Sequence, residues 1–270
     1  MQFYIESITI KGKYFSKNLE RTVDFRFVAP QDYWHSKNNF AVLLMNDGQD
    51  YDALQLERTL SLAFSSATIR PFLYVGISCN ENRIHEYGTA STADFKGRGG
   101  LAVNYSEFII EEFIPFLKNE FKVSKEGKEW VYCGMSLGGL SAFDIVYNHS
   151  LHFGKVGVFS GSFWWRKKAY VKNDLVDRSR IVLDVVKNGP YADHLKFWFQ
   201  CGTLDETADR NNNGIIDAID DTLDLIKELT LKGYSYPGAI TYVQVDGGKH
   251  DLTTWGKVFP QFIKWAMGAN

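Results

Sequence analysis

The stretch Gly134-Met135-Ser136-Leu137-Gly138 follows a predicted strand over residues 129–133 and precedes a predicted helix over residues 139–148. When a strand runs directly into a helix, the junction residue adopts a strained backbone conformation, and small neighbours let the two backbones approach closely. Ser136 would then stand at the tip of the turn, where the helix N-terminus favours developing negative charge. The context therefore predicts that Ser136 is a nucleophile, whereas the pattern alone also fits a glycine-rich turn with an incidental serine.

The composition fits one large domain. Of the 270 residues, 45% are hydrophobic and 15% are aromatic, which is enough for a single core over residues 1–270. The formal net charge is −2, and the 30 basic residues are scattered along the chain. This distribution argues against nucleic acid or an anionic membrane surface as a partner. Nothing in the composition indicates the oligomeric state.

No segment predicts export or membrane insertion. The longest apolar runs have the length of a strand, and residues 1–6 lack a basic region followed by an apolar one. We therefore expect a cytoplasmic protein, with a periplasmic or secreted location open if a leader was removed. Cys79, Cys133 and Cys201 lie in or beside strand-like segments without metal-type spacing, which favours buried free thiols over a disulfide or a redox site.

The first part of the chain predicts two kinds of strand. Residues 2–10 and 21–29 alternate between apolar and polar side chains, as half-exposed antiparallel strands do. Residues 41–45 and 72–77 are continuous apolar runs, which are typical of strands covered on both faces. A helix is predicted between these two runs, over residues 53–65.

Strands and helices then alternate to the end of the chain. Asn104, with an acidic residue three positions on, predicts the start of a helix that continues to about Phe121 despite Pro115. Further strands are predicted over 156–159, 195–200 and 240–245, and further helices over 219–231 and up to about Ala266. This order predicts an α/β fold, with a mostly parallel central sheet, an antiparallel N-terminal edge and helices on both faces. Residues 163–194 lack a clear period, and we expect them to form a partial cap over the site.

A serine hydroxyl needs a base, and the base needs a partner that fixes its tautomer. His250 is favoured as the base because it lies in a glycine-rich turn after the last predicted strand, at the sheet edge where ligand sites gather. His149 and His152 lie beyond the helix that follows Ser136, and we interpret them as surface residues. His85 lies in a loop and could line the pocket. A solvated turn histidine is the alternative interpretation of His250.

The acid should follow an earlier strand, because this fold order runs serine, acid, histidine along the chain. Asp205 lies in the loop after the predicted strand 195–200 and is preferred. Glu206 is the alternative, since a small shift of the loop would bring its carboxylate into reach. Asp251 is less favoured because adjacent residues rarely face one another.

Six short segments of the chain share a characteristic order and spacing. They are Asp47-Gly48-Gln49, Arg83 with Glu86-Tyr87-Gly88, Gly134-Met135-Ser136-Leu137-Gly138-Gly139, Ser160-Gly161-Ser162-Phe163-Trp164-Trp165, Cys201-Gly202-Thr203-Leu204-Asp205, and Gly247-Gly248-Lys249-His250-Asp251 with Trp255. Together they resemble the putative-esterase family of α/β-hydrolases, from about residue 20 to residue 268. That family is similar to enterochelin-esterase-like siderophore hydrolases, feruloyl and acetyl-xylan esterases, S-formylglutathione hydrolase and the mycolyltransferases.

This resemblance implies an α/β-hydrolase fold and a serine carboxylic-ester hydrolase that works through an acyl-enzyme. It implies that Ser136, Asp205 and His250 form the catalytic triad, and that the backbone amides of Leu137 and Gln49 form the oxyanion hole. The expected partner is a small ester of the aryl, acyl-sugar or siderophore type, and no cofactor is expected in catalysis. Two alternatives stay open: an acyltransferase with the same triad, and a non-catalytic binding protein on the same fold.

Three aromatic residues follow the predicted strand 156–159. Phe163, Trp164 and Trp165 could form an apolar wall for an acyl or aryl group, and packing in the core is an equal alternative. Trp164, Trp165 and Arg83 are the expected substrate-binding residues.

Residues 209–220 fit the spacing of an EF-hand-type calcium loop. Oxygen-bearing side chains occupy positions 1, 3, 5, 9 and 12, glycine occupies position 6, and a backbone carbonyl lies at position 7. The expected ligands are Asp209, Asn211, Asn213, Asp217 and Asp220, with the carbonyl of Ile215. Asp220 stands where glutamate is usual and no helix precedes the loop, so the segment looks more like the single calcium loops of dockerins.

A structural Ca²⁺ would relieve the charge of this loop. Asp209, Asp217, Asp220 and Asp221 would otherwise crowd like charge with only Arg210 to offset it. The ion would also hold the triad acid in place, because the loop begins only a few residues after it. An asparagine-rich turn before a helix is the alternative interpretation.

Overall fold

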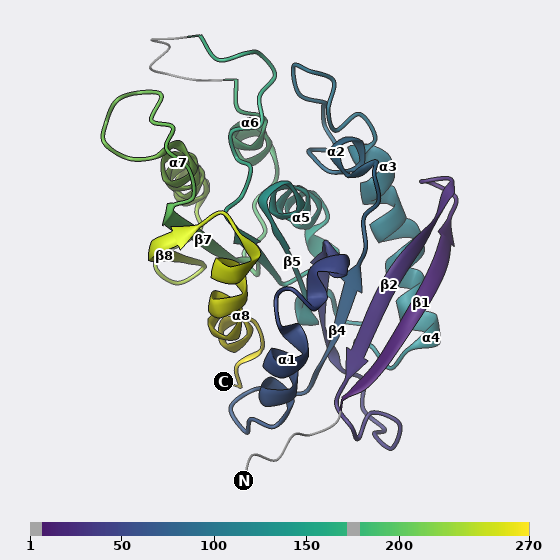
Figure 1. Cartoon of the computed structure of the whole chain (residues 1–270). Helices are drawn as coiled ribbons and strands as arrows, with labels where there is room; N and C mark the ends of the chain where they lie inside the picture. The colour runs from purple at the N-terminus through teal and green to yellow at the C-terminus, as the bar shows by residue number, and fades with distance from the viewer. Residues whose placement is uncertain (1–6, 172–178, 270) are drawn as a thin grey trace.

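The computed structural model describes residues 7–171 and 179–269, and an eight-stranded sheet runs through the middle of this part of the chain (Figure 1). Its strand order is β1-β2-β4-β3-β5-β6-β7-β8. The strands are β1 (Ile8–Ser16), β2 (Arg21–Ala29), β3 (Ala41–Asn46), β4 (Phe72–Ile77), β5 (Trp130–Met135), β6 (Lys155–Phe159), β7 (Lys196–Leu204) and β8 (Ile240–Lys249). β1 pairs antiparallel with β2 and β2 with β4, whereas the pairs from β4 to β8 are parallel. The predicted α/β sheet with an antiparallel N-terminal edge is therefore confirmed.

Burial follows the two kinds of strand pattern in the sequence. Every residue of β3, β4 and β5 is buried, as expected for strands between two helical layers. Residues of β1 instead alternate between partly buried and exposed positions. Lys11 and Lys13 are among the exposed residues of β1, which forms one edge of the described sheet.

Helices cover both faces of the sheet. α1 (Leu56–Phe64) and α8 (Leu252–Met267) lie side by side on one face and enclose one hydrophobic cluster (Figure 1). The second cluster lies under α4 (Ile114–Glu120), α5 (Ser136–Asn148), α6 (Ile181–Asn188) and α7 (Asp217–Lys232), together with α3 (Ala102–Glu107). The shorter elements are η1 (Gly48–Tyr51), α2 (Arg83–Glu86), the π-helical η2 (Phe108–Phe113), η3 (Gly127–Glu129) and η4 (Ser150–His152).

The first strand lies further along the chain than predicted. The prediction placed it over residues 2–10, but β1 begins at Ile8 and pairs with β2 up to Ser16. The alternating pattern continues to Ser16, and only four residues separate its end from Arg21, so the tight hairpin connection sets the register. Residues 1–6 lie outside the described residues.

The helix predicted from Asn104 begins earlier. α3 starts at Ala102 with Leu101 at its N-cap, and the Asn104 side chain donates to the backbone carbonyl of Asn18 at 3.1 Å instead of capping. Pro115 is tolerated because it lies in the first turn of α4, where the backbone hydrogen-bond pattern changes after the π-helical η2. In the first turn of a helix, a proline costs no backbone hydrogen bond.

The predicted cap is described only in part. Residues 172–178 lie outside the described residues. α6 lies within the expected range 163–194, and it packs against α5 and α7 with Ile181, Val182 and Val186 buried. α6 therefore belongs to the helical layer on the sheet, and a cap over the site stays a prediction for the remainder of the range.

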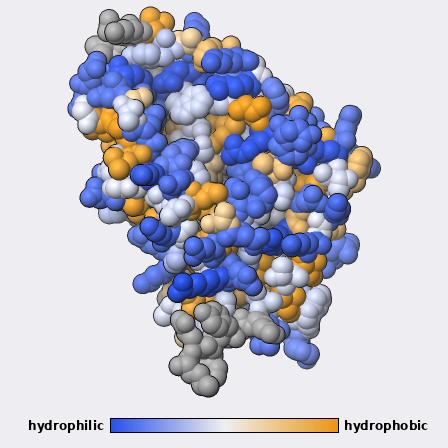
Figure 2. Space-filling view, in the orientation of Figure 1, coloured by the Kyte–Doolittle hydropathy of each residue, from blue (hydrophilic) through white to orange (hydrophobic). Residues whose placement is uncertain are grey.

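The surface and the thiols match the expectation of a globular protein. The face seen in Figure 2 is mostly hydrophilic, with small hydrophobic patches scattered over it. Within residues 7–171 and 179–269, no helix combines the length and apolar character that a membrane span requires. All three cysteines are free thiols; Cys133 and Cys201 are buried as predicted, and Cys79 is partly exposed.

Candidate active site

Ser136 lies at the junction of β5 and α5 in the strained conformation predicted for it. Its φ of 52° falls in the left-handed region, which few non-glycine residues adopt. The flanking glycines are required by close packing. A Cβ on Gly134 would overlap the backbone of Gly138, and a Cβ on Gly138 would overlap the Asp47 carboxylate. The parallel strand β5 therefore delivers Ser136 to the carboxyl edge of the sheet.

Ser136 makes its side-chain hydrogen bond with another serine. Its Oγ lies 3.3 Å from Ser162 Oγ, and the Ser162 backbone N–H donates to the Ser136 carbonyl at 3.1 Å. Among the described residues, no hydrogen bond joins Ser136 to His250. Ser162 was not among the predicted site residues, although its position just after β6, at the same sheet edge, was a usable signal.

Asp205 and His250 follow directly after a register pair of the sheet. Leu204 of β7 pairs with Lys249 of β8, and because the two strands are parallel, the next residue of each leaves the sheet at the same edge. The register shifts between Gly202 and Leu204, where β8 contains additional residues. The glycines predicted to form a turn before His250 therefore lie inside β8, which continues to Lys249.

Electrostatic interactions link this carboxylate and this imidazole. Burial raises the pKa of Asp205, while the Ser160 hydroxyl, the Gly202 amide and the His250 ring act to lower it. Desolvation lowers the pKa of His250, and the carboxylates of Asp205 and Asp251 oppose that shift. Both Asp205 carboxylate oxygens are buried, and within the described part of the chain no donor, the Ser160 hydroxyl included, meets them in hydrogen-bonding geometry.

The two competing acids have other surroundings. Burial raises the pKa of Glu206, and the charges that influence it most are those of Asp217, Asp221 and Asp205. The Asp251 side chain caps α8 by accepting the backbone N–H of Thr254 at 2.7 Å. These contacts leave Asp205 as the carboxylate that is both buried and coupled to His250.

The other candidate histidines lie elsewhere. His149 and His152 follow the far end of α5, and both are partly buried, which corrects their assignment to the surface. His149 Nε2 lies 3.1 Å from Ser106 Oγ, and burial lowers the pKa of both histidines. His85 is exposed on the short helix α2.

Trp255 contacts the candidate base. Its ring centroid lies 5.0 Å from that of His250, with an angle of 77° between the ring planes. The indole Nε1–H donates to Ser160 Oγ at 2.9 Å. Ser160 follows β6, has a φ of 47°, and donates its backbone N–H to the Gln200 carbonyl at 2.7 Å.

The loop after β3 packs against the first turn of α5. The Asn46 side-chain amide donates to the Gly138 carbonyl at 2.8 Å, and Asn46 Oδ1 accepts the hydroxyl groups of Tyr105 and Tyr132, each at 2.7 Å. Asp47 then adopts a φ of 59°, and η1 begins at Gly48. This buried network places the predicted oxyanion loop beside Ser136.

Arg83 and Gln49 have structural contacts that the sequence did not indicate. Arg83 donates through Nε and Nη2 to the two Asp47 carboxylate oxygens at 2.7 and 2.8 Å. The Gln49 side chain accepts the Cys79 backbone N–H at 3.1 Å and donates to Asp47 Oδ1 at 3.3 Å. Arg83 therefore holds the loop that carries Gln49, and contact of Arg83 with substrate stays a prediction.

The three aromatic residues after β6 divide between two environments. Phe163 and Trp165 are each 1% exposed and belong to the core, which favours the packing interpretation for both. Trp164 is partly exposed. The Arg98 guanidinium lies over both indole rings, 5.2 Å from the Trp164 centroid and 4.8 Å from that of Trp165. Trp164 is thus the member of the set that is open to a ligand.

The 209–220 loop is closed by its own polar groups. The amides of Asn211 and Asn213 donate to Asp220 Oδ2 at 2.7 and 2.9 Å. Asp209 accepts the backbone N–H groups of Asn213 and Gly214 at 3.1 and 2.9 Å. Four of the predicted ligands, Asp209, Asn211, Asn213 and Asp220, are therefore joined by hydrogen bonds within the loop.

Asp217, which was predicted to be a calcium ligand, instead contacts Arg210. Its Oδ1 accepts the Arg210 backbone N–H at 2.9 Å and lies 3.3 Å from Arg210 Nη1. Asp221 is paired with both Arg210 and Arg180, so the expectation that only Arg210 offsets the loop charge was wrong. Sequence spacing could not reveal Arg180, which comes from the start of α6. Among the described residues, no three His, Cys, Asp or Glu side chains gather as a metal site, so asparagine oxygens would have to complete one.

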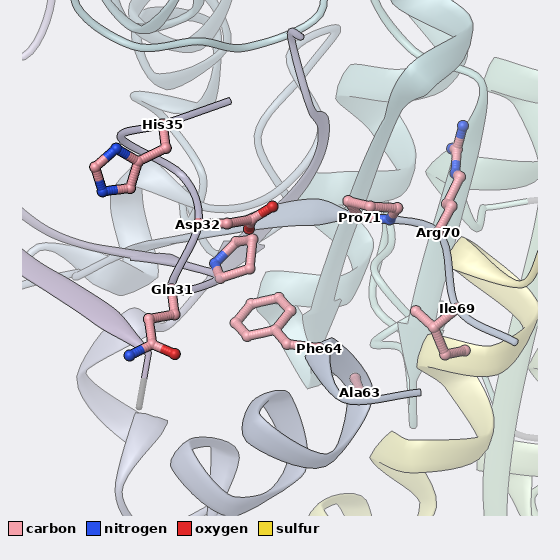
Figure 3. A pocket seen from close by; sticks show the side chains of 9 residues that line it. Gln31, Asp32, His35, Ala63, Phe64, Ile69, Arg70 and Pro71 are labelled. Atoms are coloured by element: carbon pink, nitrogen blue, oxygen red, sulfur yellow. The ribbon is translucent and has the colours of Figure 1, made fainter. Parts of the chain in front are cut away.

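A separate cavity of about 570 Å³ lies at the opposite edge of the sheet (Figure 3). Its wall includes His35 and Asp32 from the connection before β3, Phe64 at the end of α1, and Arg70 before β4. These segments lie at the amino ends of the parallel strands, whereas Ser136 lies at a carboxyl end. The cavity is therefore not part of the candidate active site.

Comparisons with known proteins identify the family of the chain. Residues 16–266 match the family described as "Putative esterase", and the chain belongs to this esterase family. The uncharacterized protein YbbA of Bacillus subtilis (strain 168) is 31% identical over 149 residues, a match that spans 54% of this chain and 59% of the relative.

Solved structures share the fold. A ferulic acid esterase superposes with a TM-score of 0.73 at 15% identity, covering 97% of this chain and 98% of that chain. The enterobactin esterase FES from Shigella flexneri, solved in the presence of enterobactin, also gives 0.73, at 19% identity, covering 96% of this chain and 59% of that one. At these identities the likeness establishes the α/β fold of these esterases and leaves the substrate to other evidence.

Proposed function

We propose that this protein is a serine carboxylic-ester hydrolase with Ser136 as nucleophile, His250 as general base and Asp205 as the acid that orients His250. One observation carries the proposal. The three residues leave β5, β7 and β8 at the same carboxyl edge of the sheet, with Ser136 in a strained turn and Asp205 electrostatically coupled to His250. Membership of an esterase family supports the same chemistry.

The reaction would proceed in two halves. Ser136 Oγ attacks the ester carbonyl while His250 accepts its proton, and the backbone amides of Leu137 and Gln49 stabilise the oxyanion. His250 then protonates the departing alcohol, and water repeats the sequence on the acyl-enzyme. Proton transfer requires Ser136 Oγ to turn from Ser162 toward His250. Such hydrogen bonds often form only when substrate is bound.

The substrate class is inferred from a partly exposed aromatic side chain and from the structural relatives. Trp164 is the partly exposed aromatic residue near the site and favours an aryl or acyl group beside it. Two structural relatives are named as ferulic acid and enterobactin esterases. We propose a small ester of the aryl, acyl-sugar or siderophore type.

A fluorophosphonate probe and a chain-length series test the proposal. We expect the probe to label Ser136, S136A to lose labelling and activity together, and short p-nitrophenyl esters to be hydrolysed. A folded protein whose Ser136 stays unlabelled would instead support a non-catalytic binding protein. Addition of an alcohol acceptor distinguishes the acyltransferase alternative, because transfer would then give a new ester in place of the free acid.

We also propose that the 209–220 loop binds a structural Ca²⁺. The donor set fits a hard cation, since the converging groups are the carboxylates of Asp209 and Asp220 and the amides of Asn211 and Asn213. The Ile215 carbonyl would complete the set. The ion would brace the segment that follows Asp205 and would take no part in the reaction.

A further inference from the structure

Trp255 connects the residues proposed as base and acid. Its ring lies against His250, and its indole N–H donates to Ser160 Oγ at 2.9 Å. Trp255 is 6% exposed and Ser160 is 2% exposed, so water competes little for this hydrogen bond. One side chain of α8 therefore touches His250 directly and is linked by one hydrogen bond to the serine beside Asp205.

The direction of this hydrogen bond determines where the Ser160 hydrogen can go. An indole N–H can only donate, so Ser160 Oγ accepts from Trp255 and keeps its own hydrogen for another acceptor. We infer that Asp205 is that acceptor: both of its carboxylate oxygens are buried and have no donor in hydrogen-bonding geometry among the described residues, so a small turn of the Ser160 side chain would satisfy one of them. The Ser160 hydroxyl is near enough to help lower the pKa of Asp205.

The backbone of Ser160 is fixed for such a role. Its φ of 47° is unfavourable for a residue with a side chain, and such a conformation persists only where the surroundings enforce it. The backbone hydrogen bond to the Gln200 carbonyl at 2.7 Å ties Ser160 to β7, the strand that leads to Asp205. The hydroxyl is thus held between α8 and the loop after β7.

We propose that Trp255 and Ser160 are positioning residues for the acid and the base: Trp255 holds the His250 ring by contact and directs the Ser160 hydroxyl hydrogen onto Asp205. This inference rests on the function proposed above. Neither residue is proposed to bind the substrate or to transfer a proton. Their effect is to keep the Asp205 carboxylate ionised and the His250 ring in place while Ser136 reacts.

The variants W255F and S160A test this role. Phe keeps a ring beside His250 and removes only the N–H group, whereas Ala removes the hydroxyl. With p-nitrophenyl acetate, we expect kcat to fall about 10- to 100-fold in each variant, since small displacements of catalytic groups cost up to about 100-fold. KM should stay unchanged. The acidic limb of the kcat/KM profile should move to higher pH, because the Asp205 carboxylate loses the Ser160 hydroxyl that favours its charged form.

Combined variants show whether the two residues act through Asp205. The double variant W255F/S160A should be no less active than the less active of the two single variants, because both changes interrupt the same proposed link from Trp255 through Ser160 to Asp205. In a D205N background, S160A should cause no further loss of kcat. Independent, additive losses in either combination would overturn the proposal.

W130F is the matched control. Trp130 is also buried, and its indole N–H donates to the Ser124 carbonyl at 2.8 Å, at the opposite end of β5 from Ser136. We expect W130F to lower Tm while kcat and the pH profile stay as in the parent.

If the parent shows Ser136-dependent activity but S160A and W255F behave like W130F, the positioning role is wrong and the esterase proposal stands. S160A decides the question if W255F fails to fold. A parent without Ser136-dependent activity would overturn the proposed function, and this inference with it.

Discussion

Asn46 donates its side-chain amide to the Gly138 carbonyl at 2.8 Å and so joins the end of β3 to the first turn of α5. Two tyrosine hydroxyls, from Tyr105 and Tyr132, complete the hydrogen bonding of its Oδ1. The proposed oxyanion loop begins at the next residue. This buried amide therefore holds the nucleophile turn against the loop that carries Gln49, whose backbone amide is proposed to stabilise the oxyanion.

Substitution N46A should lower both stability and activity. It leaves the Gly138 carbonyl and two buried tyrosine hydroxyls without their partner, and each unsatisfied buried group costs about 1–3 kcal/mol. We expect the free energy of unfolding, measured by urea denaturation, to fall by roughly 3 kcal/mol. The exposed Asn38 provides the control, N38A, which should match the parent. An N46A protein with unchanged stability would mean that the network contributes little.

Asp205 and Glu206 can be separated by amide substitution. D205N should reduce kcat by up to about 10⁴-fold, because an amide cannot stabilise the imidazolium that forms on His250. E206Q should stay within a few-fold of the parent, since the charges that act most strongly on Glu206 are those of aspartates and not of His250. Initial rates on p-nitrophenyl acetate measure both effects. The reverse order of loss would transfer the role of acid to Glu206.

Asp144 should make stability depend on pH. It is 2% exposed on α5, and burial raises the pKa of its carboxyl from 3.8 to about 7, although Ala90 N–H and the Asn148 amide donate to it. Between these two pH values the folded state holds a proton that the unfolded state has released, so this residue lowers stability as pH rises.

The variant D144N should remove that contribution. At pH 8 we expect it to be more stable than the parent, by up to about 1.4 kcal/mol for each unit of pKa shift. At pH 4 the difference should vanish or reverse. Urea midpoints at the two pH values provide the measurement, with the exposed Asp193 changed to Asn as the control. Parallel pH curves for the parent and D144N would contradict this.

Removal of calcium should lower the stability of the protein if the 209–220 loop binds Ca²⁺. A bound ion stabilises the folded state by about 2.7 kcal/mol at 100 times its Kd. Excess chelator should therefore lower Tm and esterase activity together, and added Ca²⁺ should restore both. D209A should have a low Tm that chelator does not change further. A melting curve that is the same with and without chelator would remove the proposed site.

The parts of the site that could be predicted are those with local signals. Ser136 is marked by the glycines on either side, because a strand that enters a helix needs them. Asp205 and His250 could be proposed because each follows a strand-like run, and strand ends gather at one edge of a parallel sheet. The strand boundaries were less accurate where the alternating pattern continued past the expected end, as in β1.

Contacts between distant segments had no such signal. Trp255 and Ser160 are 95 residues apart, and neither local sequence indicates the hydrogen bond between them. Arg83 was assigned to substrate binding, yet its guanidinium is taken up by Asp47, 36 residues away. Arg180 offsets the charge of Asp221 from another helix. Such pairs depend on how helices and loops pack, which single-sequence patterns do not encode.

The outer strand β1 bears on how the protein behaves at high concentration. No other strand of the described residues pairs with its outer side, so its backbone groups offer a template on which another extended chain could assemble, as in fibril growth. Lys11 and Lys13 are exposed along this strand, beside β2. A chain added there would have to lie next to two ammonium groups and strip water from them. We expect this repulsion to keep neighbouring molecules apart, so that neutralising these lysines would promote aggregation without altering the catalytic edge.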